Sequence, residues 1–218
     1  PILHDPSPIE DADILFVEST YGDRLHKNLA DTLDEFVTVV NETLQVRKGN
    51  VIVPAFAVGR TQELIYYFHH LTRQGRFRHL NIFIDSPMAT AVTHVTRGNL
   101  ALFDEEAKTL AAWHAAGKGL PNLTFVGSVD ESRALNTIHS GAIIIAGSGM
   151  CTAGRIKHHL LHNLGRSENA VVITGFQAQG TLGRRLVDGA ERVRIFGREV
   201  PVQASTHTLG GFSAHADQ

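Results

Sequence analysis

Residues 142–155, "AIIIAGSGMCTAGR", contain the pattern that decides the fold. An apolar, β-branched run leads into a loop of small residues, and the "IKHHLLHNL" that follows is typical of a helix. Because the run does not alternate with polar residues, it predicts a strand covered on both faces. The same order of strand, glycine-containing loop and helix recurs in 51–63, "VIVPAFAVGRTQE", and in 171–186, "VVITGFQAQGTLGRRL".

Further apolar runs extend this pattern along the chain. Strands alternating with helices predict an α/β fold: a Rossmann-like, mostly parallel sheet with helices on both faces. An alternating stretch around Gly197 predicts a β-hairpin, with Pro201 on an edge. We expect strands at 13–19, 50–56, 81–86, 123–128, 142–147 and 170–176, and helices near 29–46, 60–73, 87–97, 100–116, 130–138, 154–164 and 181–188.

Composition restricts the protein class. The 218 residues are 43% hydrophobic and 19% charged, as in ordinary globular domains. A net charge of -2 argues against a uniformly basic nucleic-acid coat, although a local basic groove stays open. No apolar run approaches the length of a membrane span, and the start does not resemble a signal peptide. The single cysteine, Cys151, fits a reducing compartment, so we expect a cytoplasmic protein.

A Gly-Arg pair opens the helix in each of the three repeated units, at Arg60, Arg155 and Arg184. A helix N-terminus is partly positive, so an arginine there favours a bound anion. In a parallel sheet these loops meet at one edge, which predicts a phosphate-binding rim. The alternative is that each arginine pairs with a carboxylate such as Glu18, Asp85 or Glu63.

Several familiar site motifs do not fit. In "GSGMCTAG" the third glycine stands at 154, whereas a dinucleotide-binding GxGxxG needs it at 152, and GxxxxGK[ST] is absent. His158 and His162 have the spacing of a zinc pair but no evident third ligand. We interpret both, with His159, as a solvated helix face, and Cys151 as a small buried residue.

Six stretches together indicate a family. "ILFVESTYGDR", "VPAFAVGRTQELI", "IDSPMA", "AGSGMCTAGR", "GFQAQGTLGRRL" and "FSAHADQ" occur in this order and are distributed over nearly the whole chain. They resemble the β-CASP nucleases of the metallo-β-lactamase superfamily, which include RNase J and the endonuclease subunit of the cleavage and polyadenylation specificity factor. The resemblance implies a β-CASP domain at 21–204. It assigns a strand at 1–20 and a return segment at 205–218 to a metallo-β-lactamase core.

The resemblance also implies roles for individual residues. Glu18 matches the motif A acid and His215 the motif B histidine, which would interact beside the scissile phosphate, with His215 supporting protonation of the leaving oxygen. RNA is the implied partner. Its backbone would be held by Arg60, Ser148, Gly149, Arg155, Gly180, Thr181 and Arg184, with helix capping the more favoured role of Thr181.

Features that this chain lacks complete the interpretation. The zinc-binding HxHxDH signature does not occur here. We therefore expect two zinc ions in a longer parent, none in this chain, and no activity of this chain without its metallo-β-lactamase domain. The missing initiator methionine and the ending "GGFSAHADQ" lead to the same expectation of a longer parent. Two other readings stay open, a non-catalytic nucleic-acid-binding or scaffold module and a small-molecule phosphohydrolase, and so does assembly as a homodimer.

Overall fold

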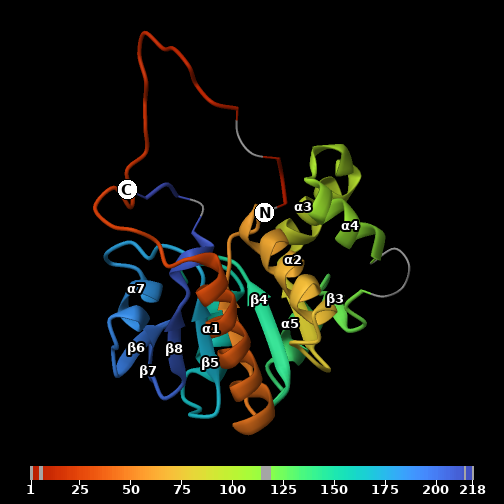
Figure 1. Cartoon of the computed structure of the whole chain (residues 1–218). Coiled ribbons are helices and arrows are strands. Elements are labelled where there is room, and N and C mark those ends of the chain that lie inside the picture. Colours follow the sequence, from red (N-terminus) through yellow and green to blue (C-terminus); the bar gives the residue numbers. More distant parts are fainter. Residues whose placement is uncertain (1, 5–6, 114–118, 214, 218) are drawn as a thin grey trace.

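A parallel sheet forms the centre of the computed structural model, which describes residues 2–4, 7–113, 119–213 and 215–217 (Figure 1). In this described part, six strands lie in the order β3–β2–β4–β1–β5–β8, and each strand pairs parallel with its neighbours. β4, β1 and β5, which precede the three Gly-Arg loops, are therefore neighbours. The strands are β1 Val51–Pro54, β2 Asn81–Asp85, β3 Leu123–Phe125, β4 Ala142–Ala146, β5 Ala170–Ile173 and β8 Ser205–Thr208.

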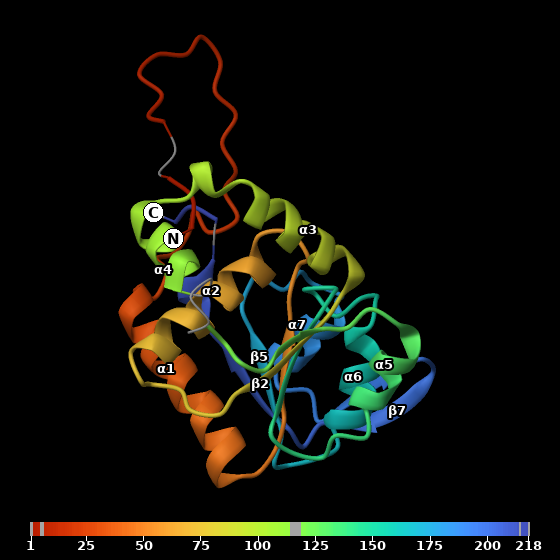
Figure 2. The same ribbon diagram turned by 90° about the vertical axis from the view of Figure 1, so that its right-hand side faces the viewer.

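Helices cover both faces of the sheet, with α1 and α2 on one side and α5 and α6 on the other (Figure 2). Side-chain alternation within β1 explains the two layers: Val51 and Val53 pack into one apolar cluster and Ile52 into the other. The helices are α1 Leu29–Asn41, α2 Arg60–Arg73, α3 Pro87–Gly98, α4 Glu105–Trp113, α5 Val129–Leu135, α6 Ile156–Asn163 and α7 Leu182–Val187.

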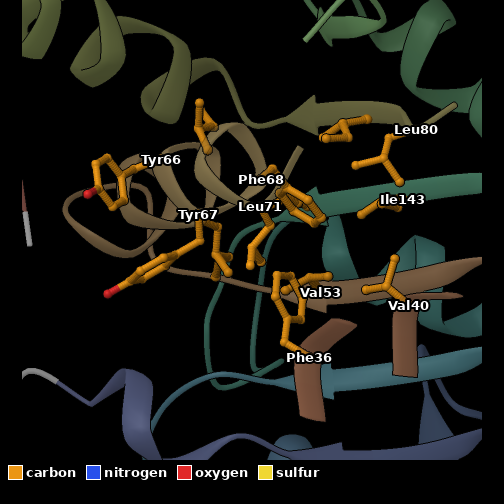
Figure 3. Close-up of a cluster of buried hydrophobic side chains, with 14 of the residues drawn as sticks. Phe36, Val40, Val53, Tyr66, Tyr67, Phe68, Leu71, Leu80 and Ile143 are labelled. Carbon is orange, nitrogen blue, oxygen red and sulfur yellow. The ribbon is translucent and has the colours of Figure 1, made fainter. Parts of the chain in front are cut away.

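Aromatic rings fill the centre of the first cluster (Figure 3). Phe36 of α1 is fully buried, and its ring centroid lies 5.0 Å from that of Phe68 of α2. Phe212, near the C-terminus, meets Phe36 edge to face at 5.5 Å. Such tilted and edge-to-face contacts are the favoured aromatic geometries. They fasten α1, α2 and the chain end to one core.

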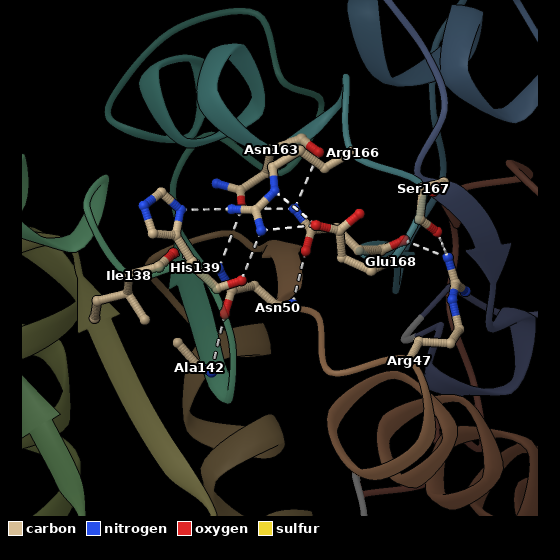
Figure 4. A network of polar contacts seen from close by, with 10 residues as sticks. Arg47, Asn50, Ile138, His139, Ala142, Asn163, Arg166, Ser167 and Glu168 are labelled. Atoms are coloured by element: carbon tan, nitrogen blue, oxygen red, sulfur yellow. Dashed lines mark hydrogen bonds and ion pairs between the residues drawn. The ribbon is translucent and has the colours of Figure 1, made fainter.

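Asparagines and an arginine organise the amino edge of the sheet (Figure 4). The side chain of Asn50, just before β1, donates to the carbonyl of Ile138 at 2.7 Å and accepts from the N–H of Ala142 at 3.1 Å. Arg166 pairs with Glu168 at 2.7 Å beside it. Because these groups saturate one another at the strand starts, this network joins β1 to β4 and serves the fold.

The predicted α/β fold is confirmed, and so is the hairpin. It consists of β6 Arg192–Ile195 and β7 Arg198–Pro201, paired antiparallel. Its two turn residues, Phe196 and Gly197, both have positive φ (49° and 78°), as a tight hairpin turn requires. Among the described residues, no helix is long and apolar enough to cross a membrane.

The structure differs from the sequence prediction at both ends. Residues 13–19 form no strand, and Phe16 is 93% exposed, because none of the described strands lies beside this segment to complete a ladder. Conversely, residues 205–208 form β8 and extend the same sheet through β5. The predicted division into domains at 20 and 205 stays a prediction. Of the expected helix 100–116, Leu100–Leu102 form a short 3-10 helix and Glu105–Trp113 form α4, whereas 114–116 lie outside the described residues.

Candidate active site

Glu18 and His215 lie side by side although 197 positions separate them in the sequence. The C-terminal segment, dark blue in Figure 1, returns to the red N-terminal segment. His215 Nδ1 lies 3.3 Å from Glu18 Oε2, and the N–H of Ala216 donates to Glu18 Oε1 at 2.8 Å. Both side chains are about half exposed. The contact predicted between these two residues is therefore present, at the surface of this chain.

Hydrogen bonds keep Glu18 ionised. The backbone N–H of Thr20 donates to Glu18 Oε2 at 2.9 Å, and this bond is the largest cause of a pKa lowered to about 2. The Thr20 side chain, the N–H of Ala216 and the charge of His215 lower the pKa further. A carboxylate that stays charged at neutral pH can hold the ring of His215 in one orientation and stabilise its protonated form.

A second layer of contacts, absent from the sequence prediction, supports this pair. The N–H of His26 donates to Asp217 Oδ2 at 2.6 Å, and its ring Nε2 donates to the carbonyl of His215 at 2.9 Å. The ring of Tyr21 lies 4.5 Å from that of His26 and 5.9 Å from that of His215. Tyr21 and Asp217 do stand inside the stretches "STYGDR" and "SAHADQ", which was the available signal.

The three predicted arginines all follow neighbouring strands, but each is in an ion pair. Arg60 pairs with Glu63, as the alternative reading expected. Arg184 pairs with Asp188 at 2.9 Å, one turn further along the chain. Arg155 Nη1 lies 2.6 Å from Asp85 Oδ1, and Asp85 is another carboxylate that the alternative reading named. A guanidinium has five N–H donors, so an ion pair leaves donors for a phosphate, and the phosphate-binding role of these arginines stays a prediction.

Asp85 is the centre of a buried network at the carboxyl end of β2. It is fully buried and accepts hydrogen bonds from Ser132 at 2.6 Å and Arg155 at 2.6 Å, with His159 Nε2 at 2.7 Å. Burial alone would raise the pKa of Asp85, but the bonds from His159, Ser132 and Arg155 outweigh burial and lower it. The interpretation of His159 as solvated was wrong. It points inward onto Asp85, whereas His158 and His162 are exposed.

The remaining predicted phosphate contacts organise their own loops. Ser148 Oγ accepts from the N–H groups of Thr152 and Ala153, both at 3.1 Å. Thr181 Oγ1 accepts from the N–H of Arg184 at 3.1 Å, which confirms its role as the N-cap of α7. Gly149 packs against Phe56, and Gly180 takes a positive φ of 81°. Burial raises the pKa of Cys151 to about 12, so its thiol stays protonated.

A cavity of about 810 Å³ opens at the same edge of the sheet. Its wall includes Arg60, Gly149 and His215 from the predicted set, together with Phe56 and Phe176. Most of the remaining lining is apolar. The cavity therefore joins the surface beside His215 to the loops that follow β1, β4 and β5.

Comparison with known proteins decides the family. Residues 61–186, more than half of the chain, match the Beta-Casp domain. The chain belongs to the Beta-Casp domain family. The resemblance found in the sequence is thus confirmed, and the matched range runs from the first turn of α2 into α7.

The relatives of this Beta-Casp chain include nucleases. It is 41% identical to Ribonuclease TTHA0252 of Thermus thermophilus over 100% of this chain and 50% of that protein. It is 31% identical to an RNase J-like protein of Methanocaldococcus jannaschii, over 99% of this chain and 49% of the relative. Transcription termination factor FttA of the same archaeon is 32% identical over 94% of this chain and 33% of that protein. The chain thus spans at most about half the length of these relatives.

The described residues of this Beta-Casp chain do not fit a metal centre. Across the described ranges, no three His, Cys, Asp or Glu side chains gather into a group that could hold a metal ion. Glu18 is instead committed to backbone N–H groups and to His215, and Asp85 to three donors. No step of the chemistry below is therefore assigned to a metal held by these residues.

Proposed function

We propose that this chain is the Beta-Casp part of a longer ribonuclease that hydrolyses RNA phosphodiester bonds. The contact between Glu18 and His215 is the observation that carries the proposal. Named ribonucleases among the relatives support it. Because the chain matches half the length of those relatives, we assign the activity to the longer parent. In that parent the metal dependence, which we propose involves two zinc ions, resides in residues outside this chain.

His215 acts as the general acid in this proposal. A histidine can transfer a proton near neutral pH, and such transfer typically contributes about 10²–10⁴-fold to a rate. Glu18 contacts Nδ1 of His215, so the other ring nitrogen, Nε2, is the one that protonates the leaving oxygen. Half-exposure of both side chains leaves room for the phosphodiester to approach.

The loops at the carboxyl edge hold the RNA backbone. Backbone N–H groups near Gly149 and Gly180 and the spare donors of Arg60, Arg155 and Arg184 contact phosphates. Since such contacts are electrostatic, affinity should fall as salt rises. The protein acts in the cytoplasm, where a single unpaired cysteine is unremarkable.

Cleavage of labelled RNA by the longer parent, supplied with zinc, tests this function. His215→Ala should lower kcat by about 10²–10⁴-fold, and Glu18→Gln should lower it in the same direction, because the amide no longer stabilises a protonated ring. His94→Ala, an exposed histidine on α3, is the matched control and should cleave normally. Undiminished cleavage by both site variants would remove the assignment. RNA binding without cleavage by the wild type would favour the scaffold reading.

A further inference from the structure

Two exposed phenylalanines line the cavity beside His215. Phe56 lies two residues after β1 and Phe176 three residues after β5, in the loops that follow these neighbouring strands. Their exposed fractions are 49% and 37%. Single exposed apolar side chains are common on protein surfaces, so exposure alone indicates nothing. Here, however, Phe56 and Phe176 line the same cavity as His215 and Arg60.

Phe56 packs against the loop backbone at Gly149 on one side. A Cβ placed on Gly149 would come within 2.8 Å of Cδ2 and Cε2 of the Phe56 ring. The absence of a side chain at Gly149 therefore leaves space for the Phe56 ring beside the loop backbone, while half of the Phe56 side chain stays exposed. A ring supported on one side loses less conformational entropy when a second flat group packs on it than an unsupported ring would.

Phe176 is linked to the catalytic pair through one aromatic ring. Tyr21 meets Phe176 edge to face, with centroids 5.9 Å apart and planes at 89°. The same Tyr21 ring lies 5.9 Å from that of His215. A planar group on Phe176 would thus lie close to a phosphate held at His215.

We propose that Phe56 and Phe176 are stacking platforms for nucleobases of single-stranded RNA next to the cleaved bond. This inference rests on the proposed function and names the part of the substrate that the apolar cavity takes. Every base has a π-face that stacks on aromatic side chains without regard to sequence. Arg60 at the same wall is paired with Glu63 but keeps N–H donors for the connecting phosphate, and His215, which also lines the cavity, contacts Glu18. The cavity therefore selects unpaired RNA over a duplex, whose bases are already stacked.

A cycle of protein and substrate changes tests the platforms in the longer parent. Phe56→Leu and Phe176→Leu keep apolar bulk but remove the ring, and Phe56→Tyr restores it. Phe196→Leu, at the β6–β7 turn, is the matched control, since Phe196 is also 49% exposed. The substrates are RNA oligonucleotides with one abasic ribose, placed in turn at each position around the cleaved bond.

For the wild type, one or two abasic positions should raise KM by about 5- to 150-fold, the size of one stacked base. On intact RNA, the leucine variants should show a similar rise in KM. Their KM should not rise further with the substrate that lacks the matching base. Phe56→Tyr should have a KM close to that of the wild type. If each abasic position raises KM equally in the wild type and in the leucine variants, the stacking proposal is wrong. It is also wrong if Phe196→Leu raises KM on intact RNA as much as Phe56→Leu and Phe176→Leu do. If the wild type cleaves abasic and intact RNA equally well, the stacking proposal is wrong but the proposed function stands. If the wild type neither binds nor cleaves RNA, both the stacking proposal and the proposed function are wrong.

Discussion

Replacing Asp85 with alanine should lower the free energy of unfolding by about 3–5 kcal/mol, the cost of breaking a buried charge pair. The fully buried carboxylate accepts from Ser132 and Arg155, both at 2.6 Å, and lies 2.7 Å from the ring of His159. Arg155 is partly exposed and can turn to water, but His159 is fully buried. Most of the loss therefore comes from donors left without an acceptor.

Urea unfolding followed by circular dichroism measures this loss. Asp188→Ala is the matched control, because Asp188 also pairs with an arginine but is half exposed, and such a pair contributes about 1 kcal/mol or less. In a thermal scan, each kcal/mol moves the melting temperature of a chain of this size by about 2–4 °C. The Asp85 variant should then melt about 6–20 °C below the wild type.

The pH dependence has a definite sign. The folded-state pKa of Asp85 lies below its usual value of 3.8, so its stabilisation is complete above that value and is lost as pH falls through the folded-state pKa. The difference between wild type and Asp85→Ala should be largest near pH 7 and shrink below about pH 4. If Asp85→Ala costs no more than Asp188→Ala, or if the difference grows in acid, the network does not stabilise the fold.

Two further substitutions test the core and the loop that follows β4. Phe36→Ala should cost about 3–5 kcal/mol in urea unfolding, because the buried ring contacts Phe68 and its removal leaves a cavity; a loss below 1 kcal/mol would contradict the described core. Gly154→Ala should cost more than Gly180→Ala: both have positive φ, but only at Gly154 would the new Cβ strike the carbonyl of Gly147, so equal losses would refute that contact.

The sequence was most informative where hydrophobicity alone determines structure. β1 and β4 are continuously apolar because both faces of the sheet are covered there, and both lie within the strand ranges predicted from the sequence. β8, "STHT", sits at the sheet edge with its residues half exposed or exposed, so it lacked that signal. The segment 13–19 has the signal but forms no ladder, because strand formation also needs a neighbour.

For the site, the outcome depended on how far apart the partners are in sequence. Glu18 and His215 were found through family motifs, which carry long-range information that spacing does not. The bond between Asp85 and His159 joins a strand end to a helix 74 positions later, and nothing in the local pattern of either residue announces it. His158, His159 and His162 lie within five positions, and the sequence alone does not show which of them points inward and which is exposed.

Contacts of residues 18–26 with residues 215–217 bring the N-terminal and C-terminal segments of the described chain together. Because 197 positions separate Glu18 from His215, the fold of the residues between them brings the two side chains together. In the longer ribonuclease that we propose, Glu18 and His215 would therefore meet only on a folded Beta-Casp domain.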